Sequence, residues 1–106
     1  MRMLVKLAGV TFGDCQLNLR LYKAGNPLHL QRVPENEFDY NAISVRSGTM
    51  HLGWIPKIVA AELAPMMDRG KVYHVAPTKI NEAKGEKTIG MTVIVKDDED
   101  EKPNIG

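Results

Sequence analysis

The chain has 106 residues, of which 43% are hydrophobic and 25% are charged, a composition typical of one globular domain. Its single cysteine, Cys15, cannot form an internal disulfide, which argues against a disulfide-stapled secreted protein. The opening MRMLVKLAGVTFGDCQ contains Lys6 and no sustained apolar run, which argues against a signal peptide or a membrane span. We therefore expect a cytoplasmic protein without a membrane partner.

The charges are distributed unevenly along the chain. Five of the 13 acidic residues form one run, residues 97–101, whereas residues 1–96 carry 13 Lys and Arg against 8 Asp and Glu, a net formal charge of +5. A basic body attracts polyanions, and an acidic tail can compete for the same surface. We predict a folded domain over residues 1–96 and an acidic, flexible tail over residues 97–106.

Alternation of apolar and polar residues predicts short strands in the first half of the chain. These strands cover residues 3–11, a segment that begins at Leu28, residues 42–46 and residues 50–55. The last two are joined across Ser47-Gly48, a spacing typical of a hairpin. The stretch LNLRLY, residues 17–22, is amphipathic, but its periodicity does not select helix or strand.

A helix is predicted after the fourth strand. Pro56 suits the first turn of a helix, Gly70 suits its end, and Pro65 is expected to kink or divide it. Two further strands, residues 72–80 and 88–96, complete a count of six. In the last strand Ile89, Met91, Val93 and Val95 alternate and are predicted to point into the core, with Thr92 and Lys96 on the other face. We predict a mainly β fold with an interrupted helix between strands four and five, closed as a small barrel because closure removes exposed sheet edges.

Sequence patterns for catalysis or metal binding are missing. His29, His51 and His74 lie in different segments, and no Cys-x-x-Cys or His-x-x-x-His spacing occurs. Neither glycine-rich phosphate-binding pattern is present, and no signature supports Cys15 as a nucleophile. We predict a protein that is not an enzyme, with no catalytic residue, no metal and no cofactor.

Aromatic side chains near strand ends are the main candidates for ligand binding. Phe12, Phe38, Tyr40, Trp54 and Tyr73 are five of the six aromatics. Positive charge near them is expected from Arg32, Arg46, Lys57 and Lys71. Small barrels bind single-stranded nucleic acid by stacking bases on aromatic rings while cations contact phosphates. The alternative, which composition alone favours, is that Trp54 and the phenylalanines fill a small core.

Two segments, VPENEFDYNAISV (residues 33–45) and HLGWIPKIVAAELAPMMDRG (residues 51–70), resemble the HIRAN domain family. The matching positions are Gly9-Val10, Gly25-Asn26-Pro27-Leu28, Pro34, Asn36, Phe38, Asp39, Asn41-Ala42-Ile43, Val45, Gly53-Trp54-Ile55-Pro56 and Ala61-Glu62-Leu63-Ala64. The matches keep order and spacing from about residue 5 to residue 95. The resemblance implies an OB-like six-stranded barrel with a helical insertion, in a member that looks like the stand-alone bacterial or phage kind.

The resemblance also implies a ligand and the residues that contact it. In the best-understood eukaryotic member, a helicase-like transcription factor, the domain holds the 3′ end of single-stranded DNA. By position, Asp39 matches the aspartate that recognises the free 3′-hydroxyl, Phe38 the aromatic residue before it, and Lys57 a basic phosphate contact. Thr11 and Phe12 stand where that member has an arginine and a tyrosine, and Trp54 is a stacking platform if exposed.

Some of these positions carry a second interpretation. Thr11 lacks the positive charge of the arginine, and Glu37 adds negative charge where a proline is common, so we expect weak, salt-sensitive binding. Asp39 is also expected to accept a hydrogen bond from the backbone N–H of Asn41, in an Asx-turn that starts the next strand.

These observations lead to one functional prediction and one alternative. We predict a module that recognises a free 3′-hydroxyl end of single-stranded DNA, in DNA repair or at replication forks, with a helicase or remodelling ATPase acting in trans as a further partner. The predicted DNA-binding residues are Thr11, Phe12, Phe38, Asp39, Trp54 and Lys57. The alternative is a protein-interaction or regulatory barrel without DNA binding, which Thr11, Glu37 and the acidic tail favour.

Overall fold

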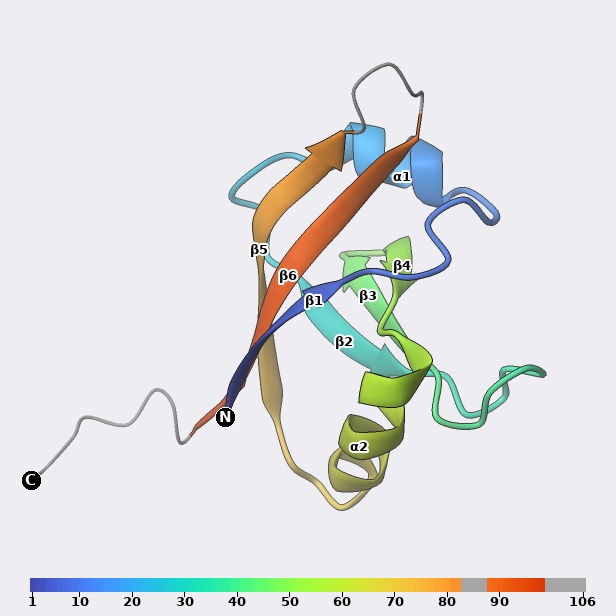
Figure 1. The fold of residues 1–106 in the computed structure, drawn as a ribbon, viewed down its shortest axis with the longest axis vertical. Helices are drawn as coiled ribbons and strands as arrows, with labels where there is room; N and C mark the ends of the chain where they lie inside the picture. The colour runs from blue at the N-terminus through green and yellow to red at the C-terminus, as the bar shows by residue number, and fades with distance from the viewer. Residues whose placement is uncertain (83–87, 99–106) are drawn as a thin grey trace, which may run out of the picture.

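The computed structural model describes residues 1–82 and 88–98, which form a small mixed α/β domain (Figure 1). In chain order the elements are β1 (Arg2–Lys6), α1 (Cys15–Leu21), β2 (His29–Arg32), β3 (Ile43–Ser47), β4 (Met50–Trp54), α2 (Lys57–Asp68), β5 (Tyr73–Glu82) and β6 (Ile89–Asp97). The predictions of six strands and of a helix between strands four and five are confirmed within these residues. A second helix, α1, was not predicted.

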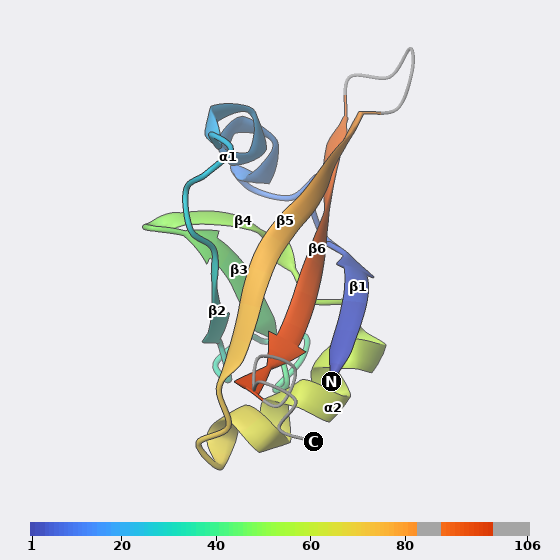
Figure 2. The ribbon, with the colours of Figure 1, turned by 90° about the vertical axis from the view of Figure 1, so that its left-hand side faces the viewer.

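The six described strands form two antiparallel sheets of three strands each, in the orders β1-β6-β5 and β2-β3-β4. The sheets lie on opposite sides of the core (Figure 2). An isolated bridge joins them at one edge, where Ala8 N donates to Trp54 O over 2.8 Å and Trp54 N donates to Ala8 O over 2.9 Å. Within the described residues, the strand ladders thus make two bridged sheets and no continuous ladder around a barrel.

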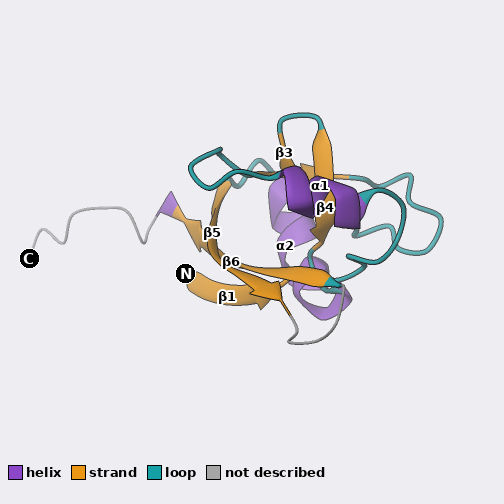
Figure 3. Cartoon of the chain, turned by 90° about the horizontal axis from the view of Figure 1, so that it is seen from above, coloured by secondary structure: helices purple, strands orange, loops and turns teal. Residues whose placement is uncertain are grey.

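The core fills the space between the two sheets with side chains that alternate along the strands. Met91, Val93 and Val95 of β6 are fully buried and face Ile43, Val45 and Leu52 of the other sheet. The intervening residues of β6 lie on the outer face, as the alternation predicted. Helix α1 covers one end of this core and α2 lies toward the other end (Figures 1 and 3).

Helix α1 was not predicted because it is short and because the spacing of its leucines is also compatible with a strand. It has 7 residues, and the buried side chains Cys15 and Leu19 are four positions apart, whereas Leu17 and Leu21 are exposed. Leucines at every second position mimic a strand. Gln16 fixes the helix in place by donating from Nε2 to Val10 O and Ile89 O, each over 2.8 Å, and accepting from Ile89 N over 2.8 Å.

Helix α2 is continuous, so the prediction that Pro65 interrupts it is wrong. Proline removes one helical N–H, and the carbonyl that loses its partner belongs to Ala61, four residues earlier. Both residues are exposed, so water can satisfy that carbonyl. The helix ends as predicted near Gly70, whose φ of +98° and N–H bond to Met67 O (2.9 Å) form a glycine-dependent C-terminal turn.

Asp97, placed in the tail by the sequence analysis, is the last residue of β6 and its carboxylate is buried. Its Oδ1 accepts from the N-terminal ammonium of Met1 over 2.9 Å, and its Oδ2 lies 3.2 Å from Lys71 Nζ. The ammonium hydrogen bond is the main cause that lowers the pKa of Asp97 to about 2. Residues 99–106 of the predicted tail lie outside the described residues.

Neither helix of the described residues is long and apolar enough to cross a membrane.

Candidate functional site

The loop between β2 and β3 is held by side chains that bond to its own backbone. Asn36 Oδ1 accepts from Phe38 N over 2.8 Å and from Asp39 N over 3.1 Å. Asp39 Oδ1 accepts from Asn41 N over 2.9 Å, which confirms the predicted Asx-turn. Because these bonds fix the backbone on both sides of it, Phe38 projects outward with 82% of its surface exposed.

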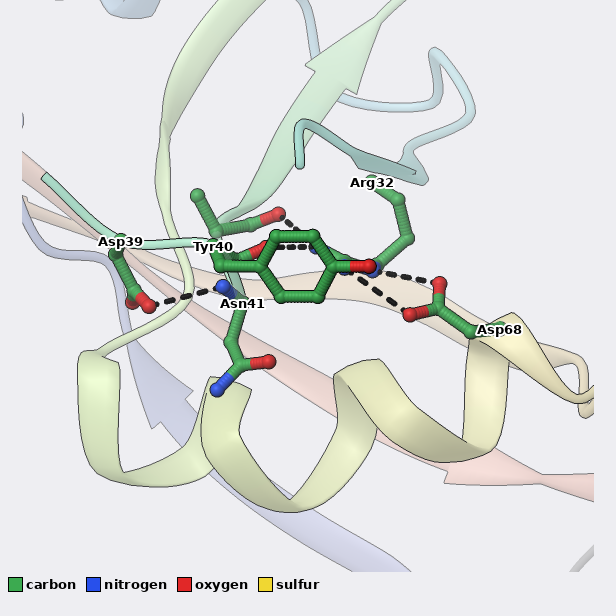
Figure 4. A network of polar contacts seen from close by, with 6 residues as sticks. Arg32, Asp39, Tyr40, Asn41 and Asp68 are labelled. Carbon is green, nitrogen blue, oxygen red and sulfur yellow. Dashed lines mark hydrogen bonds and ion pairs between the residues drawn. The ribbon is translucent and has the colours of Figure 1, made fainter. Parts of the chain in front are cut away.

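Arg32 anchors the same loop from β2 (Figure 4). Its Nη1 donates to Tyr40 O over 3.0 Å and to Ala42 O over 2.8 Å, and its guanidinium lies 5.4 Å from the centre of the Tyr40 ring. Its other nitrogens form a bidentate pair with Asp68 at the end of α2, over 2.9 and 3.1 Å. This hydrogen bonding from Arg32 lowers the pKa of Asp68. Arg32, expected to supply charge to a ligand, is thus engaged in holding the loop.

The loop between β2 and β3 forms one wall of the site. The turn at Gly9, where the chain leaves β1, forms a second wall. Gly9 has a φ of +65°, and a Cβ atom there would lie 2.7 Å from Trp54 Cδ1, so the close approach of Trp54 requires glycine. The turn is closed by Phe12 N, which donates to Gly9 O over 3.2 Å. Since Ala8 pairs with Trp54, this turn brings Phe12 to the same edge as the indole ring.

These two walls and the start of α2 enclose a groove of about 650 Å³, a size typical of ligand sites. The groove is lined by Ala8, Gly9, Phe12, Asn36, Phe38, Asp39, Ala42, Trp54, Ile55 and Lys57. The structure therefore brings together five of the six predicted site residues. Thr11 is exposed in the turn and does not line the groove, and neither does Glu37, which is exposed in the opposite loop.

The aromatic residues of the groove are accessible rather than packed in the core. Phe12 is 72% exposed, and Trp54 is partly buried against its neighbours. The interpretation of the two phenylalanines as core residues is therefore wrong, because the core is filled by aliphatic side chains and Tyr22 instead. Phe12, Phe38 and Trp54 present ring surface from three different segments to one space.

Two charged side chains line the groove. Lys57 is the first residue of α2 and is exposed, beside the free N–H groups of the helix start. Asp39 Oδ2 makes no hydrogen bond to any described residue. The other cations that the sequence suggested lie elsewhere: Lys71 pairs with Asp97, and Arg46 donates to Thr49 O.

His51 supports Trp54 from within β4. The two ring centroids lie 4.5 Å apart with an angle of 60° between the ring planes. His51 Nδ1 is hydrogen-bonded to Ser44 Oγ, and burial, reinforced by the charge of Arg46, lowers the pKa of His51. A neutral imidazole therefore packs against the indole at neutral pH. Sequence analysis considered His51 only as a metal ligand.

Sequence reasoning missed the small and polar residues that shape the groove. Ala8, Ala42 and Ile55 line it without a chemical signature that sequence could reveal. Asn36 carries a usable signal, since an asparagine two and three residues before the backbone groups it accepts from is typical of a capped loop. Among the described residues, no three His, Cys, Asp or Glu side chains are grouped so that they could hold a metal ion.

The fold and the groove define a small two-sheet binding domain with aromatic walls. Residues 3–97 match the HIRAN domain family, and the chain belongs to that family.

Two solved structures share this fold. The crystal structure of a protein from Lactobacillus plantarum is 24% identical, with a TM-score of 0.67 over 90% of this chain and 95% of that chain. The crystal structure of the HIRAN domain of human HLTF is 23% identical, with a TM-score of 0.59 over 89% of this chain and 72% of that chain. No curated protein sequence matches the chain significantly.

Proposed function

We propose that the groove binds the end of a single DNA strand that carries a free 3′-hydroxyl. The observation that supports this proposal most strongly is the composition of the groove: three aromatic faces, one carboxylate with an unused oxygen, and one lysine at a helix start. Membership of the HIRAN family agrees with it, because the resemblance described in the sequence analysis implies a domain that holds the 3′ end of single-stranded DNA.

Base stacking supplies most of the proposed affinity. Phe12 and Phe38 are exposed on facing walls, and each base stacked on an aromatic side chain is worth about 1–3 kcal/mol. Trp54 is held in position by Gly9 and His51, so it loses little conformational freedom when a base packs on it. The two phenylalanine rings carry no hydrogen-bond donors or acceptors, which fits binding with little sequence preference.

Asp39 supplies the proposed end selectivity. Oδ1 is committed to Asn41 N, which fixes the carboxylate, and Oδ2 can accept a hydrogen bond from a 3′-hydroxyl. A 3′-phosphate, or a strand that continues past this point, would bring a negative charge against the carboxylate. The same geometry therefore attracts a free end and repels the two common alternatives.

Lys57 is the proposed phosphate contact. Its ammonium group and the N–H groups at the start of α2 attract an anion to the same end of the groove. Because Lys57 is the one cation among the lining residues, the electrostatic share of the affinity is small. The logarithm of the binding constant should fall with the logarithm of salt concentration with a slope of about −0.7 per phosphate contacted.

Fluorescence anisotropy at low salt with three labelled oligonucleotides, ending in a 3′-hydroxyl, in a 3′-phosphate and in a duplex, tests this proposal. The hydroxyl end should bind at least about tenfold more tightly than the other two, since one charge-assisted hydrogen bond is worth about 1.5–3 kcal/mol. Asp39→Asn is the matched variant, because asparagine keeps the Asx-turn while an NH₂ group replaces the unused oxygen. Equal affinity for all three ends would refute end recognition.

A protein-interaction or regulatory domain without DNA binding is the second candidate. The near balance of charge among the groove residues favours this second candidate. One lysine and one aspartate line the groove, and Arg32 is paired with Asp68 instead of facing a ligand. This alternative predicts no measurable binding of any oligonucleotide at low salt.

We also propose a setting and a finer description of the fold for this module. Binding of free 3′ ends suits DNA repair or stalled replication forks, with a helicase or remodelling ATPase acting in trans. The two bridged sheets suit a partly open OB-like barrel, whose rim carries the groove.

A further inference from the structure

We propose that the outer face of the β1-β6-β5 sheet is a second binding surface, which takes an acidic amphipathic helix of a partner protein. None of its residues lines the groove, so this proposal does not rest on DNA binding. The surface is defined below by three rows of residues, and it is called the outer face from here on.

The strand register places three rows of side chains across the outer face. Residues in one row are direct neighbours on adjacent strands. The first row is Arg2, Lys96 and His74, the middle row is Leu4, Ile94 and Ala76, and the third row is Lys6, Thr92 and Lys79. On β1 and β6 the alternate residues point into the core, so the residues between them share the outer side of the sheet. On β5 the register shifts between Pro77 and Lys79, and this shift places Lys79, three residues after Ala76, opposite Thr92.

The middle row is apolar and reaches solvent. Leu4 on the edge strand is 69% exposed, Ala76 on the other edge is exposed, and Ile94 between them is partly buried. A single exposed leucine needs no explanation. A row that crosses the whole sheet and is flanked by charges on both sides is the pattern of an interface core with a polar rim.

The two outer rows are basic. Arg2, Lys6 and Lys79 supply three positive charges, Lys96 is a fourth basic residue that already makes a contact of its own, and none of the nine positions is Asp or Glu. A carboxylate already sits at one corner, where Asp98 Oδ1 lies 2.6 Å from His74 Nε2. The complement of this face is therefore an acidic partner.

The spacing of the rows selects the shape of the partner. Residues on one face of a strand are two apart, so the basic rows lie roughly 13 Å from each other with the apolar row midway. An α-helix with its side chains is about 10–12 Å wide. A helix laid along Leu4, Ile94 and Ala76 would seat its apolar stripe on that row and place its flanks over the two basic rows. Three strands span roughly 10 Å, which corresponds to about two helical turns.

The apolar row also favours a protein segment over nucleic acid. A phosphate backbone gains from the cations but nothing from Leu4 and Ile94, whereas a helix with leucines at spacings of three and four residues gains from both. The two electrostatic flanks would fix the position of the helix and speed its association.

The test uses a fluorescein-labelled helical peptide of about 14 residues with a leucine stripe flanked by glutamates. Two control peptides replace the glutamates by glutamine or the leucines by serine, and a single-stranded oligonucleotide serves as the polyanion control. Amide chemical shifts of the full chain locate each ligand. We expect the acidic leucine peptide to shift β1, β6 and β5 residues, and both control peptides to bind about tenfold more weakly.

Variants of the protein complete the test. Leu4→Ser and the pair Lys6→Glu with Lys79→Glu should each weaken the peptide about tenfold. Matched controls are Leu21→Ser and Lys23→Glu, which change exposed residues near α1 and should leave the peptide affinity unchanged. Thermal unfolding of each variant shows that the fold is kept.

Three results would overturn the proposal. The first is an affinity that does not respond to Leu4→Ser while the fold remains intact. The second is an oligonucleotide that shifts the outer face when the peptide does not, which would assign the surface to nucleic acid. The third is peptide binding that occurs only after Glu99, Asp100 and Glu101 are neutralised as amides, which would assign the surface to the chain's own tail.

Discussion

Replacing Gly9 by alanine tests whether the turn after β1 positions Trp54 for binding. Gly9 and Gly13 both have positive φ angles, +65° and +56°, and an L-residue there costs about 1–2 kcal/mol. Their surroundings differ: a Cβ at Gly9 would lie 2.7 Å from Trp54 Cδ1, and a Cβ at Gly13 would have no atom within 4 Å. Gly13→Ala is therefore a control with the same backbone strain and no contact.

The two variants should separate stability from binding. Ordinary carbon contacts lie at about 3.5–4.0 Å, so the Gly9→Ala methyl group must displace the Trp54 ring by roughly 1 Å. This crowding adds about 1–3 kcal/mol, so Gly9→Ala should lose about 2–5 kcal/mol and Gly13→Ala about 1–2 kcal/mol.

Urea unfolding measures these losses, indole emission reports the environment of Trp54, and anisotropy reports oligonucleotide affinity. Gly9→Ala should shift the emission and weaken binding, whereas Gly13→Ala should change neither. If both variants lose the same stability and keep the same emission and affinity, Gly9 does not position Trp54 and the reasoning is refuted.

Three further predictions follow from the polar contacts. Arg32→Gln removes the two hydrogen bonds to loop carbonyls and the bidentate pair with Asp68, so it should cost about 1–3 kcal/mol in thermal unfolding and weaken oligonucleotide binding. The control Arg46→Gln should leave binding unchanged, and equal effects of the two variants would contradict the anchoring role of Arg32. The pKa of Asp97 is lowered from 3.8 to about 2, so the stabilisation of the fold by its carboxylate is present above pH 4 and is lost as the pH falls toward 2. Asp97→Asn should abolish this part of the acid-unfolding curve, and an unchanged curve would contradict the prediction. Because the pKa of His51 is lowered, its protonation and the resulting change in Trp54 emission should occur below pH 6.5. The emission change should disappear in His51→Gln, and a midpoint of this change at or above pH 6.5 would contradict the buried, neutral imidazole.

Much of the fold could be predicted because alternation fixes which residues of a strand are buried. In β6, Met91, Val93 and Val95 are buried as expected, and Gly70 ends α2 as expected. Helix α1 could not be predicted because its stabilising contacts are distant in sequence: Gln16 bonds to Ile89, 73 residues away. Propensity rules cannot reveal such a tertiary contact.

The candidate site was predictable to the extent that its residues carry chemistry. The Asx-turn at Asp39 follows from local side-chain bonding and was predicted. Pairing of Ala8 with Trp54 joins two sheets, and it decides that Phe12 faces the groove while Thr11 does not. A contact distant in sequence also explains the role of Arg32. We expected Arg32 near a ligand, but its guanidinium pairs with Asp68, 36 residues away.

A thermodynamic cycle tests whether Asp39 recognises a free 3′-hydroxyl. The cycle combines the wild-type chain and Asp39→Asn with two oligonucleotides that differ only in a 3′-hydroxyl or a 3′-hydrogen, so that no charge changes on the DNA. We predict a coupling of about 1–2 kcal/mol between the carboxylate and the hydroxyl. A coupling of zero, with both oligonucleotides still bound in the groove, would contradict the claim.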